Sequence, residues 1–234
     1  MTANRPFRFG VVSAQAGSGE EWAARARAIE SMGYSTLLMP DGLRFSLAPL
    51  PALAAAAMAT RSLRVGTYVL ANDFRNPVLL AKEAATVDVV SDGRFELGIG
   101  AGRPGAADDN RMLGVPFESG GARVAALAES LALIKPLLAG ETAIATGPRY
   151  SADAAEIMPR PLQQPRPPLL VAGSGRRILS LAAREADIVA IGVPPTEPEA
   201  KVAERIGWLR EAAGPRFDQL ELNITLMAVG EQVP

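Results

Sequence analysis

The chain has 234 residues, and its 24 Lys and Arg residues balance 25 Asp and Glu residues to a formal net charge of −1. This near-neutral balance argues against general nucleic-acid binding, which requires a basic face. The sequence contains neither Cys nor His, which excludes disulfides, thiolate and imidazole metal ligands, and His-based acid–base catalysis. We therefore expect no metal site, and proton transfer would have to use carboxylates, Tyr, Lys, water or a cofactor.

The N-terminal residues carry no secretory signal pattern. The longest apolar stretch, residues 47–60, contains Pro49 and Pro51 and is too short to span a bilayer. We therefore expect a cytoplasmic protein without a membrane partner.

Short apolar runs alternate along the chain with longer amphipathic stretches. The predicted strands are residues 7–13, 36–39, 63–70, 95–100, 168–172, 188–191 and 220–228. The predicted helices are residues 19–32, 51–60, 77–91, 122–138, 176–185 and 198–213, while the segment 141–164 is predicted to be irregular.

This regular alternation implies an α/β fold with a parallel sheet and helical crossovers. An open doubly wound sheet and an eight-stranded β/α barrel, which usually has about 250 residues, both fit the pattern. Because no linker or shift in composition interrupts the chain, we expect one domain over residues 1–234. Seven strands fit a TIM-type (β/α)8 barrel that lacks its last β/α unit in this chain, with residues 7–13 and 220–228 as its two free edges.

In both architectures, ligands bind at the carboxyl ends of the parallel strands. Asp41 follows the second strand, where barrel enzymes place catalytic groups, although Asp-Gly is equally a common turn pair. Leu70, Ala71 and Asn72 lie at the end of the third strand.

The strongest signal for a site is the run Gly173-Ser174-Gly175-Arg176, which follows a buried strand and opens a helix. Small residues let main-chain N–H groups approach an anion, and the helix N-terminus adds a favourable dipole. The run therefore predicts a phosphate-binding loop, with a tight turn bearing surface arginines as the alternative.

A second glycine-rich run, residues 100–105, formally matches the G-x-G-x-x-G pattern. The run follows the fourth strand, includes Pro104 and lacks the acidic strand end that the dinucleotide fingerprint requires. We interpret Gly102 and Arg103 as a close approach of the main chain to a ligand plus one cation, with a glycine-rich strand end as the alternative.

Several blocks together resemble the luciferase-like monooxygenase superfamily. The most extended are residues 82–88 and 91–102, the latter reading SDGRFELGIGAG. The further blocks are Gly33-Tyr34 leading to Pro40-Asp41, Gly114-Val115-Pro116-Phe117 before Arg123, the Pro-rich approach 159–168, Gly173-Ser174-Gly175, and Ala182-Ala183 before Ala186-Asp187. The resemblance covers nearly the whole chain, and it is closer to the branch that uses the deazaflavin F420 than to the branch that uses FMN.

The resemblance implies a β/α barrel whose cofactor phosphate is held at Gly173, Ser174, Gly175 and Arg176. It further implies that the cofactor ring lies over the third strand, near a non-proline cis peptide bond expected at residues 70–72. Many F420-dependent members carry His after the Asp of the second strand, whereas this chain has Gly42.

We therefore expect an F420-dependent oxidoreductase that transfers a hydride between the deazaflavin and a small organic substrate, with Asp41 managing the proton. The alternatives are an FMN-dependent luciferase-like monooxygenase and a non-catalytic flavin-binding or structural barrel. Small side chains and surplus apolar residues in the helices 51–60 and 77–91 predict a homodimer interface, as the resemblance also implies.

Overall fold

A computed structural model describes residues 6–45, 47–194 and 196–226, which form two compact units that divide after Pro168. Each unit is described by itself. That the whole chain forms one domain stays a prediction.

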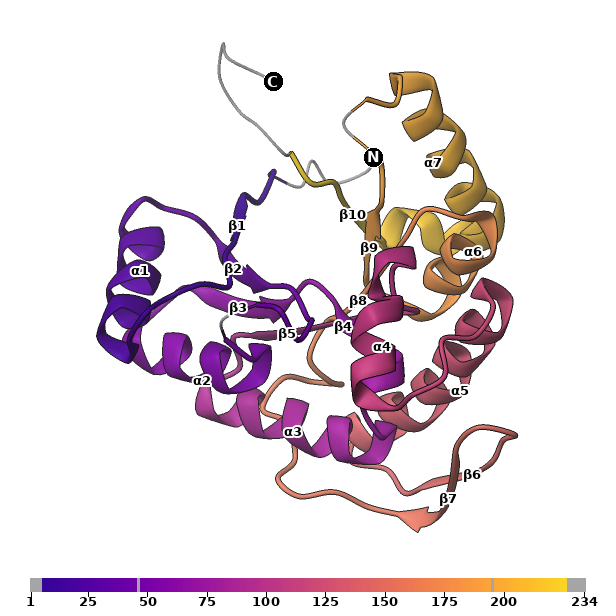
Figure 1. Cartoon of the computed structure of the whole chain (residues 1–234), viewed down its shortest axis with the longest axis horizontal. Helices are drawn as coiled ribbons and strands as arrows, with labels where there is room; N and C mark the ends of the chain where they lie inside the picture. Colours follow the sequence, from indigo (N-terminus) through magenta and orange to yellow (C-terminus); the bar gives the residue numbers. More distant parts are fainter. Residues whose placement is uncertain (1–5, 46, 195, 227–234) are drawn as a thin grey trace. The chain divides into compact units, whose positions relative to one another are not determined.

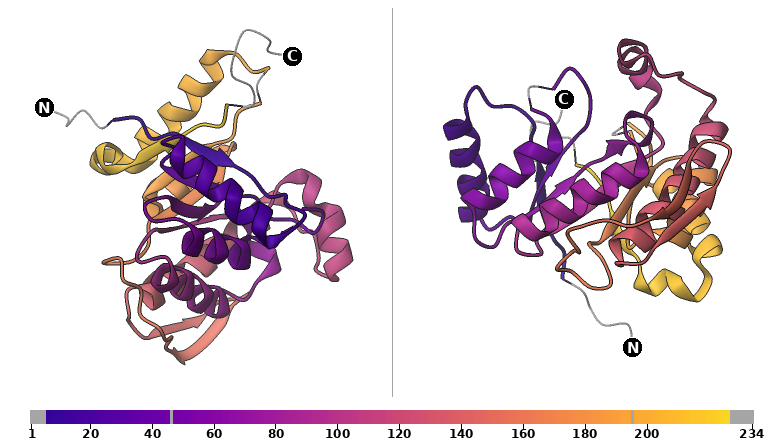
Figure 2. Two further views of the ribbon diagram at one scale, coloured as in Figure 1. Left: turned by 90° about the vertical axis from the view of Figure 1, so that its left-hand side faces the viewer. Right: turned by 90° about the horizontal axis from the view of Figure 1, so that it is seen from below.

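The first unit is built on a parallel sheet with β1 (Gly10–Val12), β2 (Thr36–Met39), β3 (Arg64–Thr67) and β5 (Phe95–Gly100) side by side in that order. Every residue of β2 and of β5 is buried, as expected for strands covered on both faces. The crossover helices α1 (Gly19–Ser31), α2 (Pro49–Ala59) and α3 (Pro77–Val90) pack side by side along one face (Figures 1 and 2).

The third predicted strand is interrupted, which corrects the continuous strand expected over residues 63–70. β3 ends at Thr67, and the short strand β4 (Leu70–Ala71) resumes the pairing with β5. At the break, the Thr67 hydroxyl donates to the Gly98 carbonyl at 2.7 Å and accepts from the Gly98 N–H at 2.8 Å. A side chain thus replaces the main-chain ladder for one residue, which no periodicity in the sequence reveals.

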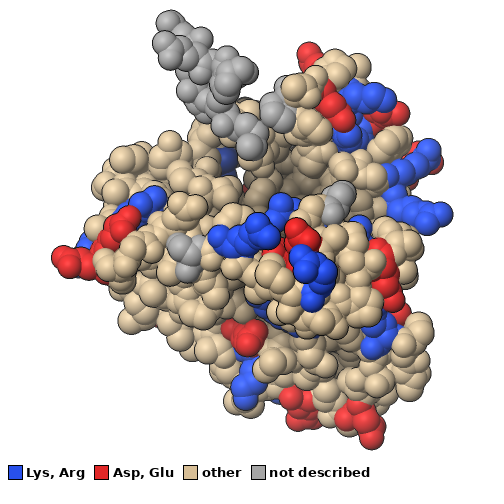
Figure 3. All heavy atoms as spheres, viewed as in Figure 1, with Lys and Arg blue, Asp and Glu red and all other residues tan. Residues whose placement is uncertain are grey.

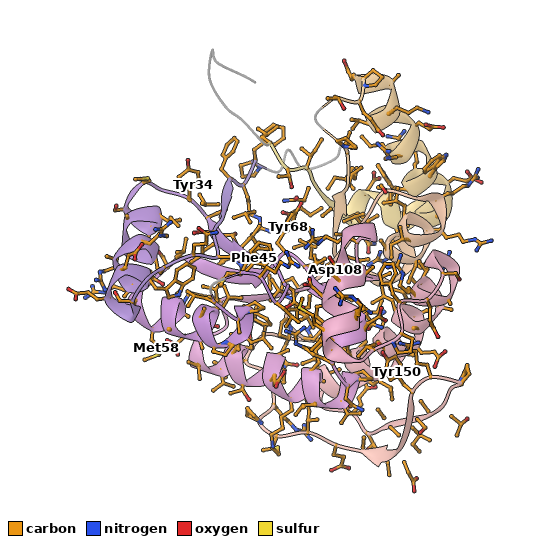
Figure 4. All side chains as sticks on the ribbon, viewed as in Figure 1. Tyr34, Phe45, Met58, Tyr68, Asp108 and Tyr150 are labelled. Atoms are coloured by element: carbon orange, nitrogen blue, oxygen red, sulfur yellow. The ribbon has the colours of Figure 1, made fainter. Side chains whose placement is uncertain are left out.

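The break also contains a non-proline cis peptide bond between Tyr68 and Val69 (Figure 4 labels Tyr68). The resemblance placed this bond at residues 70–72, so its position is corrected toward the N-terminus. The cis bond therefore precedes β4, and β4 carries two of the predicted cofactor-binding residues.

After β4 and β5 come the short helices η1 (Asn72–Phe74), η2 (Pro104–Ala106) and α4 (Ala107–Leu113). The long helix α5 (Gly120–Leu138) packs against α3 and against η1. The Ser119 hydroxyl caps the start of α5 by accepting from the Ala122 N–H at 3.3 Å.

The segment 141–164, predicted to be irregular, contains an antiparallel hairpin of β6 (Ala143–Thr146) and β7 (Ser151–Ala155). Its turn is held from another element, because the Glu129 carboxylate of α5 accepts from the N–H groups of Arg149 and Tyr150 at 3.0 and 3.1 Å. The hairpin depends on this distant carboxylate, so its own weakly patterned residues could not predict it.

The second unit has three parallel strands, β8 (Leu169–Gly173), β9 (Ile188–Ile191) and β10 (Glu221–Asn223). The helices α6 (Arg176–Glu185) and α7 (Glu199–Ala213) connect them, followed by η3 (Gly214–Gln219). The last strand is shorter than the predicted 220–228, and residues 227 and 228 lie outside the described residues.

Within the described ranges, no helix combines the length and the apolar character needed to cross a bilayer. The same residues contain no group of three acidic side chains placed to hold a metal ion. The predicted cytoplasmic location stays a prediction.

Candidate functional site

Asp41 lies at the carboxyl end of β2 and is tied to β4. Its Oδ2 atom accepts from the Ala71 N–H at 3.0 Å, and both carboxylate oxygens accept from the Arg75 guanidinium at 2.5 and 3.2 Å. The Asp41 side chain is almost fully buried. These contacts bring Asp41 together with the predicted pair Leu70 and Ala71, and they favour a role for Asp41 in fixing β4.

Asn72, the next predicted residue, is buried in η1, and its amide donates to the Tyr150 hydroxyl at 3.3 Å (Figure 4 labels Tyr150). Its neighbour Asp73 lies 3.5 Å from the Arg149 guanidinium, which also pairs with Glu118 at 2.7 Å. Burial acts to lower the pKa of Arg149, but the hydrogen bond to Tyr150 and the charges of Glu118 and Asp73 outweigh it and raise that pKa. The β6–β7 turn therefore holds the segment that follows β4.

Gly102 and Arg103 follow β5, as predicted. Gly102 has φ +78°, a left-handed conformation that favours glycine. The Arg103 side chain is 63% exposed, with its Nη2 atom 3.9 Å from Oδ2 of Asp109. Arg103 is thus a largely exposed cation at the surface, and its contact with the Asp109 carboxylate is long.

Asp109 is a candidate that the sequence motifs do not single out. Its side chain is 6% exposed, and among the described residues no hydrogen bond reaches its carboxylate. A Cβ atom built on Gly42 would meet Asp109 Oδ2 and the Phe45 ring, each at 3.2 Å (Figure 4 labels Phe45). The space beside the second strand that a side chain at position 42 would enter is therefore filled by an aromatic ring and a carboxylate.

Arg123 is the second candidate that sequence reasoning missed, having served only as a marker of the resemblance. Its residue is 8% exposed, and its Nε and Nη1 atoms are buried without a hydrogen-bond partner among the described residues. The guanidinium carbon lies 4.0 Å from the centroid of the Phe117 ring, and Nη1 would lie 3.5 Å from a Cβ at Gly102. A buried cation with unused donors is costly unless an anion or water satisfies it.

In the second unit, the predicted phosphate-binding residues lie between β8 and α6. The Gly173 carbonyl accepts from the Gly192 N–H at 2.8 Å, and the Gly175 carbonyl accepts from the Leu179 N–H at 3.1 Å. A Cβ on Gly173 would lie 2.4 Å from Ile178, so the sheet and helix approach here as only glycine permits.

The N–H groups of this loop remain available. No hydrogen bond links the main-chain N–H of Ser174 or Gly175 to any described residue, and no side chain caps α6. Ser174, Gly175 and Arg176 are exposed. The loop thus presents donors at a helix N-terminus, where an anion is favoured.

The Arg176 side chain points elsewhere, since its Nη2 atom donates to both carboxylate oxygens of Glu211 at 2.9 and 2.7 Å. The main-chain N–H of Arg176 keeps its place at the start of α6, but the guanidinium lies with the α7 carboxylate. Figure 3 shows such positive and negative side chains alternating over α7.

The family model for luciferase-like monooxygenases matches residues 5–230 of this chain. The chain belongs to the luciferase-like monooxygenase family. The resemblance read from the sequence motifs is therefore confirmed.

Two relatives of this luciferase-like chain are F420-dependent glucose-6-phosphate dehydrogenases. The protein of Beutenbergia cavernae is 36% identical over 166 residues, which are 68% of this chain and 48% of the relative. The protein of Nakamurella multipartita is 31% identical over 227 residues, which are 92% of this chain and 66% of the relative.

A third relative is the oxygenase component of the flavin-dependent trigonelline monooxygenase of Acinetobacter baylyi. It is 35% identical over 132 residues, which are 56% of this chain and 36% of the relative. The chain therefore spans about half the length, and in no case as much as two thirds, of these curated relatives.

Among solved structures, the coenzyme F420-dependent tetrahydromethanopterin reductase of Methanopyrus kandleri superposes with a TM-score of 0.81. The likeness covers 93% of this chain and 65% of the reductase at 20% identity, so it concerns the fold alone. It confirms the predicted class, a luciferase-like α/β barrel type to which this chain contributes the seven predicted strands.

Proposed function

We propose that this chain is part of an F420-dependent oxidoreductase that acts on a small organic substrate. The structural observation that carries the proposal is the set of unused N–H donors at Ser174 and Gly175, at the N-terminus of α6. The cofactor class is supported by the two F420-dependent glucose-6-phosphate dehydrogenases among the relatives.

The residues present fit a cofactor that carries a phosphate. In the second unit, Gly173, Ser174, Gly175 and the main chain of Arg176 would bind that phosphate by hydrogen bonds from N–H groups. In the first unit, the Nε and Nη1 donors of buried Arg123 lack a partner among the described residues. These donors would serve an anionic group, because a guanidinium binds phosphate or carboxylate through paired N–H groups.

When bound, F420 supplies the hydride chemistry, and the protein supplies binding, orientation and electrostatics. Asp41 would fix β4 through the Ala71 N–H, so that Leu70, Ala71 and Asn72 form the wall against the ring. Asp109, whose carboxylate accepts no hydrogen bond from a described residue, would hold or release a proton at its Oδ2 atom.

An FMN-dependent monooxygenase is the second candidate function. The specific observation in its favour is the 35% identity to the oxygenase component of trigonelline monooxygenase. The same loop 173–176 would bind the FMN phosphate, so the two candidates differ in the ring system and in the reaction.

The test is a titration of the purified protein with F420 and with FMN, followed by absorbance. We expect F420 to bind more tightly than FMN, and Ser174→Asp to weaken the binding of either cofactor about tenfold or more, because it sets a like charge against the phosphate. Ser174→Ala, which keeps every main-chain donor, is the matched control and should lose less affinity. No binding of F420 at tens of micromolar would reject the first candidate, and unchanged affinity in Ser174→Asp would reject the loop.

The predicted homodimer is part of the same proposal. It is supported by α2, which contains no charged or polar side chain in its sequence PLPALAAAAMA, and by apolar side chains exposed on its outer face and on α3. Met58 is 71% exposed and Leu79 is 55% exposed. Small residues such as the alanines of α2 allow a second helix to approach closely.

A further inference from the structure

We propose that Arg205 of α7 is a positioning residue that aims the phosphate-binding loop. The inference rests on the proposed function, in which the loop 173–176 binds the cofactor phosphate. It concerns how the second unit holds this loop before any ligand arrives.

Arg205 is a buried cation that joins two loops of the second unit. Its residue is 9% exposed, and its Nε atom donates to the Ser174 carbonyl at 3.2 Å. Its two terminal nitrogens donate to the carboxylate of Glu197, one of them at 3.2 Å. Ser174 directly follows β8, and Glu197 lies in the loop between β9 and α7, so one guanidinium connects the loops that follow two neighbouring strands.

The fork of hydrogen bonds to Glu197 fixes the guanidinium plane. Because the interaction is bidentate, the Nε–H is left pointing in one direction, toward Ser174. The hydrogen bond from Arg205 lowers the pKa of Glu197, and the same hydrogen bond raises the pKa of Arg205. The pair is thus charged throughout the neutral pH range.

A trans peptide group points its carbonyl and its N–H in opposite directions. When the carbonyls of residues 173–175 point into the protein, the N–H groups of residues 174–176 therefore point away from the protein. Gly192 N–H fixes the first carbonyl at 2.8 Å and Leu179 N–H fixes the third at 3.1 Å. Among the described residues, the middle carbonyl, that of Ser174, is the one held by a side chain, that of Arg205. Arg205 therefore sets the direction of the Gly175 N–H.

This role differs from that of a phosphate ligand. Three of the five N–H donors of Arg205 bind Glu197 and Ser174, whereas no described residue accepts from the Gly175 N–H. Removal of Arg205 should therefore reduce the affinity for the phosphate of the ligand and leave the affinity for its ring unchanged.

The experiment compares Arg205→Met with Arg210→Met, a matched variant that removes one positive charge from an exposed position of the same helix. Each protein is titrated with F420 and with its deazaflavin fragment that lacks the phosphate, and with FMN and riboflavin. We expect Arg205→Met to lower the affinity ratio of the phosphate-bearing to the phosphate-free ligand about tenfold, as one oriented charge-assisted hydrogen bond would. Arg210→Met should keep the wild-type ratio.

Hydrogen exchange of the ligand-free protein gives a readout that does not depend on the cofactor. The Leu179 and Gly192 amides, which donate to carbonyls of this loop, should exchange faster in Arg205→Met than in wild type or Arg210→Met. If Arg205→Met fails to fold, Glu197→Gln, which loosens the fork but keeps the guanidinium, should show smaller changes in the same direction.

An unchanged affinity ratio in Arg205→Met, or an equal fall in Arg210→Met, would overturn the proposal. A parallel loss for the phosphate-bearing and phosphate-free ligands would also overturn it, because that pattern indicates general unfolding. If wild type binds none of the four ligands, the proposed function fails, while the exchange of the Leu179 and Gly192 amides still decides whether Arg205 holds the loop.

Discussion

Two buried carboxylates of the first unit, that of Asp41 after β2 and that of Asp109 in α4, differ in what they contact. Asp41 accepts hydrogen bonds from Arg75 and from the Ala71 N–H, whereas Asp109 accepts none from a described residue and has only a 3.9 Å contact with Arg103. These contacts favour a structural role for Asp41 and leave the Asp109 carboxylate available for chemistry, although the two side chains are comparably buried.

This difference predicts that an Asp→Asn substitution mainly lowers stability at position 41 and mainly lowers turnover at position 109. Asp41→Asn should lower the free energy of unfolding by about 2 kcal/mol, because it weakens charge-assisted hydrogen bonds and leaves Arg75 without its anion. Asp109→Asn should change stability by less than about 0.5 kcal/mol and lower turnover about 100-fold in cofactor assays, as the loss of a general acid or base does. Urea unfolding and steady-state rates measured on both variants check this, and a stable Asp41→Asn protein would contradict it.

Glu30 gives a residue-scale prediction about pH. Its Oε1 atom accepts from the N–H groups of Arg61, Ser62 and Leu63 and from the Ser62 hydroxyl at 2.7–3.0 Å. The Ser62 N–H, followed by the other donors, lowers the pKa of Glu30 from 4.5 to about 2. Because the pKa is lower in the folded state, the carboxylate stabilises the fold fully above pH 4.5, and this contribution disappears as the pH falls toward 2.

Glu30→Gln should therefore cost about 1 kcal/mol at pH 7, a value reduced for solvent screening at this surface position. The difference in unfolding free energy from wild type should shrink between pH 4.5 and pH 2. Glu20→Gln, an exposed position of the same helix, is the control and should change little at any pH. A Glu30→Gln deficit that stays constant down to pH 2 would show that the carboxylate charge is not the cause.

The site residues divide by whether a local pattern reports them. The positions of the loop 173–176 and of Asp41 after buried strands could be predicted from a few neighbouring residues, while their roles in binding and catalysis stay predictions. Asp109 and Arg123 could not be predicted, since their significance lies in what the described residues leave unmade: a carboxylate beside Gly42 that accepts no hydrogen bond, and guanidinium donors against Phe117 that find no acceptor. Periodicity cannot show that a buried charge lacks a partner.

At the scale of elements, the break between β3 and β4 is the feature that positions the predicted ring-binding residues. The hydroxyl of Thr67 and the main chain of Gly98 meet there, and a Cβ on Gly98 would lie 1.9 Å from the Thr67 carbonyl oxygen. The register of β4 on β5, with Leu70 opposite Ile99, follows from that close approach.

Gly98→Ala should therefore destabilise the chain by about 3 kcal/mol or more, because the backbone of β3 or β5 must move to admit the methyl group. Gly207→Ala is the matched substitution, since it lies in α7 with nothing within 4 Å of the added Cβ, and it should stabilise by up to about 1 kcal/mol. Urea midpoints of both variants test the pair. Equal midpoints would show that the break tolerates a side chain.

Elements whose hydrophobic pattern is strong match their predictions closely, and those held by distant side chains do not. The predicted strands 36–39, 95–100 and 188–191 coincide with β2, β5 and β9, because continuous burial leaves only one reading of an apolar run between turn residues. The β6–β7 hairpin is short, mostly exposed and anchored by Glu129, so its stability comes from a residue outside its own sequence.

At the scale of the whole molecule, the outer surfaces of α2 and α3 bear on assembly. α1, α2 and α3 form a continuous helical layer on the first unit (Figure 1). α2 has no polar side chain to present to water, and Met58 and Leu79 are largely exposed. Isolated apolar side chains are ordinary on a surface, but a helix without any polar residue is typical of an element covered on more than one side.

The proposed homodimer therefore predicts a change of oligomeric state when charge enters this surface. Met58→Glu and Leu79→Glu should each convert a dimer to a monomer in sedimentation at micromolar protein, because burying an unpaired carboxylate at a subunit contact is strongly unfavourable. Met32→Glu, at a position 72% exposed just beyond α1, is the control and should leave the dimer intact. A wild-type chain that sediments as a monomer, or a dimer that survives both substitutions, would place the contact elsewhere or remove it. If the prediction holds, the same helical layer that covers the sheet of the first unit also joins two copies of the chain.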